Sequence, residues 1–99
     1  MSVNIGYAGD REISVDVLNF IKNKGVKPKA LLISSEKKSS HGQELIELCN
    51  HLEKSNIFKG NKFKKNESIK KLQSLDLDYI ISVHFPYIYP KSILDIPKH

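Results

Sequence analysis

The sequence is poor in several residue types, and each shortage excludes a class of protein. Only one of its 99 residues is a cysteine, Cys49, so no disulfide can form within the chain, and a reducing cytoplasm is expected. Cys49 lies in an apolar helical pattern and is interpreted as a small core residue rather than a reactive thiol. Arginine also occurs once, as Arg11. Because base recognition relies on the bidentate guanidinium group, a dedicated sequence-specific nucleic-acid reader is disfavoured.

Long apolar runs are missing as well. No run approaches the roughly 20 residues that a membrane helix needs, so no membrane association is expected. The first residues lack the basic and apolar regions of a signal peptide, which again favours a cytoplasmic location. With 39% hydrophobic and 27% charged residues, the composition is that of a single soluble globular domain over residues 1–99.

Positive charge is what the chain has in excess. Its net charge is +5, and every basic residue except Arg11 is a lysine. Seven of these lysines lie between Lys54 and Lys71, where Glu67 is the single acidic residue. Two interpretations stay open: an ordinary solvated surface, or a contact for a polyanion such as a nucleic acid or a phosphorylated substrate.

Short apolar stretches alternate with amphipathic patterns along the chain. Alternation of apolar and polar residues predicts a strand at 3–7, and uninterrupted apolar runs predict strands at 30–33, 57–58 and 79–83. Three helices are predicted between them, because apolar residues recur there at helical spacing. Their expected buried faces are Ile13, Val17, Phe20 and Ile21; Leu45, Leu48, Cys49 and Leu52; and Ile69, Leu72 and Leu75.

Polar and glycine residues predict where these helices begin and end. Asp10 is placed to cap the first helix, and Gly25 provides the left-handed residue that commonly follows a helix. Ser40 and Gln43 have the spacing of a capping box before the second helix. Asn66 is expected to cap the third.

The predicted order of strands and helices indicates an α/β fold. Strands that alternate with helices through short connections give a mainly parallel sheet covered by helices on both faces. In such open sheets, ligands bind beyond the carboxyl ends of the strands. Two loops qualify for this position: residues 8–12 after the first strand and residues 84–90 after the fourth.

The first loop is small and has an anion-binding character. Gly9 allows a close backbone approach, the following helix start offers free N–H groups, and Arg11 adds a positive charge. Asp10 opposes this, because its carboxylate repels a phosphate unless it pairs with Arg11. A plain tight turn capped by Asp10 is an equal alternative.

The second loop is aromatic and rigid. Three aromatic residues and two prolines run from His84 to Pro90 directly after an apolar strand, which suits a flat heterocyclic ligand. Simple hydrophobic packing is the alternative. His84 can be a core histidine, a metal ligand or a base; a structural role is favoured, and no metal site is predicted because no second ligand lies at usable spacing.

Two segments taken together resemble a known family. Ile5–Arg11 (IGYAGDR) and Asp78–Pro90 (DYIISVHFPYIYP) are similar to the N-terminal part of the 10-formyltetrahydrofolate-dependent formyltransferases, and Ile93–His99 fits the same pattern. This superfamily includes methionyl-tRNA, glycinamide ribonucleotide and sugar N-formyltransferases. The Gly-Asp-Arg opening looks closest to the sugar-modifying branch.

The resemblance implies a Rossmann-like three-layer α/β/α domain that transfers a formyl group from 10-formyltetrahydrofolate to a primary amine, as in an amino sugar nucleotide or methionyl-tRNA. It implies that the aromatic loop lines the pterin pocket and that the glycine turn faces the amine substrate, which often carries phosphate. A nucleic-acid partner is then expected only in the form of tRNA. The implied cofactor-binding residues are Phe85, Pro86, Tyr87, Ile88 and Tyr89, and the implied substrate-binding residues are Gly9, Asp10 and Arg11.

The family's catalytic residues have no counterpart here. Its Asn-x-His strand begins a few positions beyond the one matched by His99, and its catalytic Asp lies later still, so no catalytic residue is assigned. Residues 1–99 are therefore interpreted as a partial N-terminal domain, inactive by itself, which exposes a sheet edge prone to self-association. The alternative is a small non-enzymatic α/β module that binds nucleotides or regulates another protein.

Overall fold

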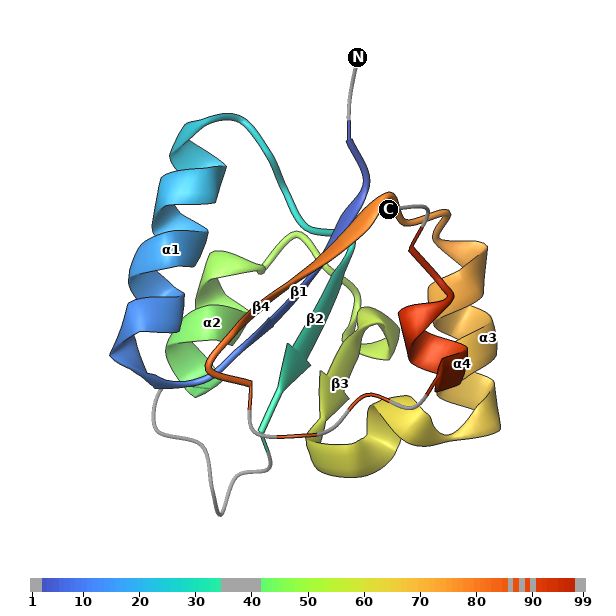
Figure 1. Cartoon of the computed structure of the whole chain (residues 1–99). Helices are drawn as coiled ribbons and strands as arrows, with labels where there is room; N and C mark the ends of the chain where they lie inside the picture. The colour runs from blue at the N-terminus through green and yellow to red at the C-terminus, as the bar shows by residue number, and fades with distance from the viewer. Residues whose placement is uncertain (1–2, 35–41, 86, 88, 90, 98–99) are drawn as a thin grey trace.

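A four-stranded, fully parallel sheet forms the centre of the molecule, which was analysed as a computed structural model (Figure 1). The structure describes residues 3–34, 42–85, 87, 89 and 91–97. The spatial strand order is β3-β2-β1-β4, which confirms the predicted α/β class and parallel sheet. The strands are β1 (Ile5–Gly9), β2 (Ala30–Ile33), β3 (Ile57–Lys59) and β4 (Tyr79–Val83).

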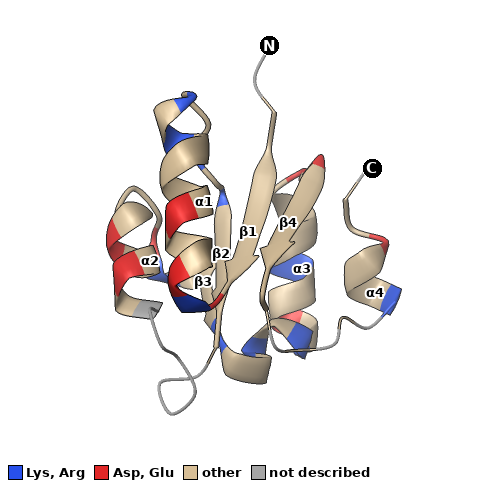
Figure 2. Cartoon of the chain, turned by 60° about the vertical axis from the view of Figure 1, so that its left-hand side comes forward, with Lys and Arg blue, Asp and Glu red and all other residues tan. Residues whose placement is uncertain are grey.

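Helices cover both faces of this sheet, so the architecture is a Rossmann-like three-layer arrangement, as expected. Figures 1 and 2 show α1 and α2 on one face and α3 and α4 on the other. Two short 3₁₀ helices flank β3. The bounds are α1 (Arg11–Asn23), α2 (Gly42–Leu48), η1 (Lys54–Asn56), η2 (Gly60–Lys64), α3 (Asn66–Ser74) and α4 (Lys91–Leu94).

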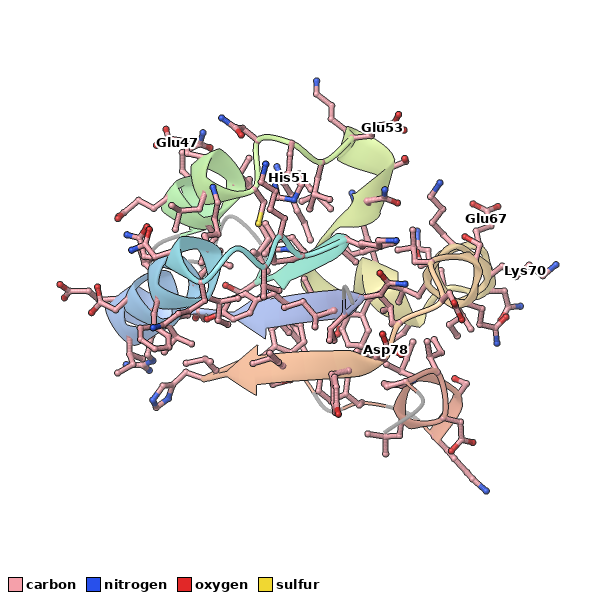
Figure 3. All side chains as sticks on the ribbon, turned by 90° about the horizontal axis from the view of Figure 1, so that it is seen from above. Glu47, His51, Glu53, Glu67, Lys70 and Asp78 are labelled. Atoms are coloured by element: carbon pink, nitrogen blue, oxygen red, sulfur yellow. The ribbon has the colours of Figure 1, made fainter. Side chains whose placement is uncertain are left out.

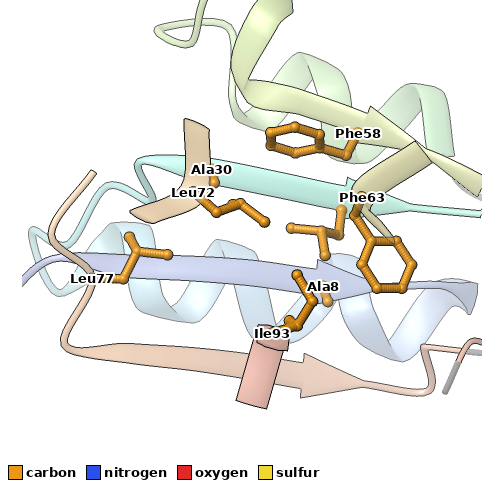
Figure 4. Packing of buried hydrophobic residues seen from close by; sticks show 8 residues of the cluster. Ala8, Ala30, Phe58, Phe63, Leu72, Leu77 and Ile93 are labelled. Carbon is orange, nitrogen blue, oxygen red and sulfur yellow. The ribbon is translucent and has the colours of Figure 1, made fainter. Parts of the chain in front are cut away.

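Each face of the sheet has its own hydrophobic core, because successive strand residues point to opposite sides. Tyr7 and Leu31 pack with Leu18 and Cys49 beneath α1 and α2. Neighbouring strand residues face α3 and α4 instead, in the core shown in Figure 4. Cys49 is fully buried, as predicted, and burial raises the pKa of its thiol to about 11. That second core comprises Ala8, Ala30, Leu32, Phe58, Phe63, Leu72, Leu77 and Ile93.

The first helix buries only part of the predicted face. Val17 and Ile21 pack on the core as expected, but Ile13 and Phe20 are 49% and 63% exposed, and Ser14 and Leu18 are fully buried instead. The prediction failed for Ile13 and Phe20 because Ser14 is small enough to lie against Gly9 of β1, and this close approach sets the rotation of α1. Phe20 instead lies beneath a lysine, with the Lys24 Nζ 5.3 Å from its ring centroid.

The predicted helix ends are partly correct. Gly25 has a φ of 87°, and the N–H groups of Gly25 and Val26 donate to the carbonyls of Lys22 and Ile21, which is the expected glycine-terminated helix end. Asp10 does precede α1, but its side chain makes no capping hydrogen bond. The third helix begins at Asn66 itself after Lys65, one residue earlier than predicted, and Ser40 lies outside the described residues. The apolar residues predicted for the second and third helices do pack on the cores, although α2 ends at Leu48, before Cys49 and Leu52.

The fourth strand is an edge strand, half exposed rather than buried. Tyr79 is 44% exposed, and β4 pairs with β1 along only one of its sides. Asp78 ties its start to the central strand by accepting a hydrogen bond from the Asn4 N–H at 2.9 Å (Figure 3). Self-association through this edge stays a prediction.

Candidate functional site

The two loops singled out in the sequence meet at one edge of the sheet. The chain proceeds outward from β1 to β2 and β3, and then returns to place β4 on the other side of β1. Such a reversal of strand order is where ligands bind in open α/β sheets. Gly9 is in register with Val83, and the Asp10 N–H donates to the Val83 carbonyl at 3.2 Å. The turn after β1 and the loop after β4 are therefore neighbours.

Arg11 has an unusual backbone in the first of these segments. Its φ is 68°, a left-handed conformation that costs a non-glycine residue about 1 kcal/mol. The Ser14 Oγ donates to the Arg11 carbonyl at 2.6 Å, and the Tyr7 hydroxyl donates to the Ser14 carbonyl at the same distance. These two buried or partly buried hydrogen bonds hold the turn in a fixed shape, with Arg11 exposed at the rim.

Gly9 acts through packing within this turn. A Cβ added to Gly9 would lie 2.7 Å from the Ser14 Cβ, closer than such atoms approach. The absence of a side chain at Gly9 therefore allows α1 to lie against β1. The close approach that was expected between the Gly9 backbone and a ligand is made by helix α1 instead. Burial, and secondarily the nearby Cys49, raises the pKa of Tyr7 to about 12, so its hydroxyl stays protonated and donates throughout the neutral range.

The aromatic loop is supported by a ring from a distant part of the chain. Phe63 of η2 is fully buried, and its centroid lies 5.5 Å from Phe85, 6.2 Å from Tyr87 and 5.8 Å from Tyr89. Phe85 and Tyr89 also stack on each other, 5.6 Å apart with an interplanar angle of 22°. The described rings of the loop thus form one half-buried cluster on the α3 and α4 face. Pro86, Ile88 and Pro90 lie outside the described residues.

A small open pocket lies beside this cluster along β4. Its volume is about 160 Å³, below the roughly 300 Å³ of a typical small-molecule site. The Tyr89 hydroxyl and the Ser82 Oγ are 2.5 Å apart at its wall. Burial raises the pKa of Tyr89, and its hydrogen bond to Ser82 partly opposes this. The pocket is lined by Ile80, Ser82, Tyr89, Ile93, Leu94 and Pro97.

The first residue after β4, His84, is exposed and has a φ of 53°. The interpretation as a core histidine is therefore wrong. Within the described ranges, no group of three or more His, Cys, Asp or Glu side chains is arranged to hold a metal ion. In the same part of the chain, no helix is long and apolar enough to cross a bilayer.

Sequence reasoning missed two residues that shape the site, Ser14 and Phe63. Ser14 stands three positions after Arg11, and a serine at that spacing in a first helical turn is a recognisable partner for a backbone carbonyl. Phe63 stands between Lys62 and Lys64, and an isolated apolar residue among charges is a signal of an anchor.

Several known proteins have sequences similar to that of this chain. No family model matches the chain. A methionyl-tRNA formyltransferase of Francisella tularensis subsp. mediasiatica is 28% identical over 105 aligned residues, which cover 98% of this chain. The same enzyme of Thermodesulfovibrio yellowstonii is 31% identical and covers the whole chain. The chain is thus related to the methionyl-tRNA formyltransferases. It spans about a third of the length of these relatives, 33% in both cases.

The resemblance to formyltransferases inferred from the two segments is therefore confirmed, and it extends over the whole chain. Both formyltransferase-like segments lie at the strand reversal. The first comprises β1 and the start of the turn after it, and the second includes β4. The residue roles implied by that resemblance remain predictions.

Proposed function

We propose that this chain forms part of the N-terminal domain of a formyltransferase that uses 10-formyltetrahydrofolate. In this proposal the aromatic loop, Phe85 to Tyr89, lines the pterin pocket, and the turn from Gly9 to Arg11 faces the amine substrate. The observation that carries it is the meeting of both formyltransferase-like segments at the strand reversal of a sheet whose sequence is related to these enzymes.

The chemistry fits two binding surfaces that meet at one edge. The amine nitrogen attacks the formyl carbon, the bond from that carbon to N10 of the folate breaks, and the proton lost by the amine ends on N10. The amine and the folate must therefore approach from adjacent positions. Phe85, Tyr87 and Tyr89 offer ring surfaces to a flat heterocycle, and the exposed Arg11 offers a cation to a phosphate on the amine substrate.

Binding and chemistry are separable in this proposal. The 99 residues contain no Asn-x-His sequence, which the family's catalytic strand supplies. We therefore propose that these residues bind the folate without catalysing transfer. The amine acceptor is a primary amine of the kind found in methionyl-tRNA or an amino sugar nucleotide; the named relatives act on the former.

The test is a titration of the ¹⁵N-labelled chain with tetrahydrofolate, followed by NMR. The amide signals of Phe85, Tyr87 and Tyr89 should shift most, and the variant Tyr89→Ala should bind about tenfold more weakly. The control is Phe20→Ala, which removes an exposed ring at a distant place on α1 and should leave the affinity unchanged. Shifts confined to residues away from both loops would contradict the proposed function.

A further inference from the structure

An open hollow lined by lysines lies at the amino ends of the strands. It is bounded by the loop from α1 to β2 and by the residues just before β1. Its volume is about 540 Å³, within the range of roughly 300–1,000 Å³ that is usual for ligand sites. Lys24, Lys27 and Lys29 line it, and all three are exposed. The other described residues in its wall are uncharged: Val3, Asn4, Gly25 and Val26.

The packing of the loop directs two of these lysines away from the core. Pro28 is fully buried between Lys27 and Lys29, which are both exposed. Two hydrogen bonds hold this part of the loop in place. The Pro28 carbonyl accepts one from the His51 ring at 2.7 Å, and the Lys29 N–H donates the other to the Ile5 carbonyl at 2.8 Å. The lysine side chains therefore extend from a backbone that is fixed at both ends of the pair.

An exposed aromatic ring adjoins the hollow. Phe20, in the last two turns of α1, is 63% exposed. The Nζ of Lys24 lies 5.3 Å from the centroid of that ring, and Lys24 also lines the hollow. The rotation of α1 that exposes Phe20 thus places one ring beside three ammonium groups. We call Phe20 and the three lysines the α1-end surface.

The acidic residues nearest to this surface lie to its sides. Glu12 and Asp16 belong to the earlier turns of α1, and Figure 2 shows basic colouring where the helix ends and acidic colouring nearer its start. Beyond the hollow, the carboxylate of Asp78 accepts a hydrogen bond from the Asn4 N–H at 2.9 Å. An anion that enters the hollow therefore meets the lysines first.

We propose that the α1-end surface binds single-stranded nucleic acid without sequence preference, with one base stacked on Phe20 and phosphates paired with the lysines. An aromatic ring beside a basic groove holds unpaired strands, because every base has a π face and every nucleotide a phosphate. The single arginine, Arg11, lies at the other end of α1, so no guanidinium reads base edges here. The inference is independent of the proposed function, whose two loops lie at the opposite end of the sheet.

The contact between Lys24 and Phe20 is compatible with this binding. An exposed cation–π pair contributes less than the stacking of a base on an aromatic side chain. A base can therefore displace the ammonium group from the ring. The Lys24 side chain is long and flexible, so it can then pair with the phosphate next to that base.

An anionic membrane is the other large partner that exposed aromatic and basic residues attract, but the α1-end surface has the wrong shape for it. A helix that lies on a bilayer needs a continuous apolar face. On α1 the exposed residues Ile13 and Phe20 are about two turns apart, and the exposed Asp16 stands between them. The lysines line a hollow rather than a flat face. Both features favour a nucleic-acid strand.

The experiment follows the fluorescence anisotropy of labelled uridine and thymidine octamers on addition of the chain. The unmodified chain should bind the two octamers within about threefold of each other, because stacking and phosphate contacts do not involve the 2′-hydroxyl. Phe20→Ala should weaken binding about tenfold, the expected effect of losing one stacked base. K24Q/K27Q/K29Q should lower the slope of log affinity against log salt by about 2, since each phosphate contact of a single strand contributes about 0.7.

Two matched controls are present in the chain. Ile13→Ala removes another exposed apolar side chain of α1 and should leave the affinity unchanged. K62Q/K64Q/K65Q removes the same charge from exposed lysines of the stretch that follows β3. It should alter the salt slope by less than the contribution of one phosphate contact.

Several results would overturn the inference. It is wrong if neither octamer binds at low salt, if one binds tenfold more tightly than the other, or if either Phe20→Ala or K24Q/K27Q/K29Q behaves as the unmodified chain does. A loss of salt slope in K62Q/K64Q/K65Q would assign the binding to the later lysines instead. Binding to phosphatidylcholine vesicles that contain phosphatidylserine, lost in Phe20→Ala while octamer binding persists, would assign the surface to a membrane.

Discussion

The two segments at the strand reversal obtain their shapes in opposite ways. The turn from Gly9 to Arg11 is held by polar contacts to residues close in sequence, Tyr7 and Ser14. The aromatic loop is held by apolar contacts to Phe63 of η2, a residue that is distant from the loop in sequence.

This difference shows that the shape of the loop depends more on the rest of the fold than the shape of the turn does. Apart from the bond of the Asp10 N–H to the Val83 carbonyl, the contacts that hold the turn lie within one strand, a tight turn and a helix, so most of its geometry is set by the first βα unit. The loop needs η2, which follows β3 at the far edge of the sheet. We therefore expect changes in the α3-side core to alter the loop and leave the turn intact.

The strongest test of this contrast is Phe63→Ala. Removing a fully buried ring should lower the free energy of unfolding by about 3–4 kcal/mol, measured by urea denaturation. NMR of the folded variant should show displaced amide signals for Phe85, Tyr87 and Tyr89, and unchanged signals for Gly9 and the rest of the turn.

Phe20→Ala serves as the control for Phe63→Ala, because that ring is 63% exposed. It should change the stability by less than about 0.5 kcal/mol. Equal displacement of the turn and the loop in Phe63→Ala would refute the separation of the two segments.

A second test attacks the turn through Gly9→Ala. The added Cβ meets the Ser14 Cβ at 2.7 Å, so α1 must shift away from β1. We expect a loss of about 2 kcal/mol in unfolding free energy, with signal changes centred on Arg11. Adding Ser14→Gly removes the clashing atom, so the double variant should be more stable than the sum of the single losses predicts.

Gly25→Ala is the matched glycine control. Gly25 has nothing within 4 Å of an added Cβ, but its φ of 87° disfavours alanine. A loss of about 1 kcal/mol is expected, without any change at Arg11. If Ser14→Gly does not rescue Gly9→Ala, the contact between β1 and α1 is not the reason for the glycine.

Much of the fold could be predicted from local pattern. The run at 30–33 is short and apolar, the run at 79–83 is rich in strand-forming residues, and Gly25 ends its helix as its position suggested. The exposed face of α1 could not be predicted in this way. Hydrophobicity favours burying Ile13 and Phe20, but the fit between Ser14 and Gly9 decides the rotation of the helix.

The site was predictable only as two separate loops. Placement of each loop after a strand followed from the sequence, since ligand loops follow strand ends in parallel sheets. Their adjacency depends on β4 returning to pair with β1, which no local pattern encodes. The support from Phe63 was equally hidden, because the lysines around it dominate the composition of that segment.

The third test, controls aside, has the smallest expected effect at neutral pH: Tyr7→Phe removes one of the two hydrogen bonds that hold the turn. The variant removes the hydrogen bond to the Ser14 carbonyl and should cost about 1 kcal/mol of unfolding free energy. The dependence on pH makes the assignment specific. Burial raises the pKa of Tyr7 from 10.0 to about 12, so the folded state keeps a proton that the unfolded state releases. The stability from this group is complete below pH 10 and is lost as pH rises from about 10 to 12.

Cys49 contributes a similar loss at slightly lower pH, because its pKa rises from 9.0 to about 11 on burial. Urea denaturation between pH 8 and 12 should therefore show both losses in the unmodified chain. Tyr7→Phe should retain the part from Cys49 between about pH 9 and 11, and Cys49→Ala the part from Tyr7 between about 10 and 12. Both variants should keep the alkaline loss from Tyr89, whose pKa burial also raises. A variant Tyr7→Phe whose alkaline profile matches that of the unmodified chain would show that the Tyr7 hydroxyl is not buried, and the clamp on the turn would then need another source.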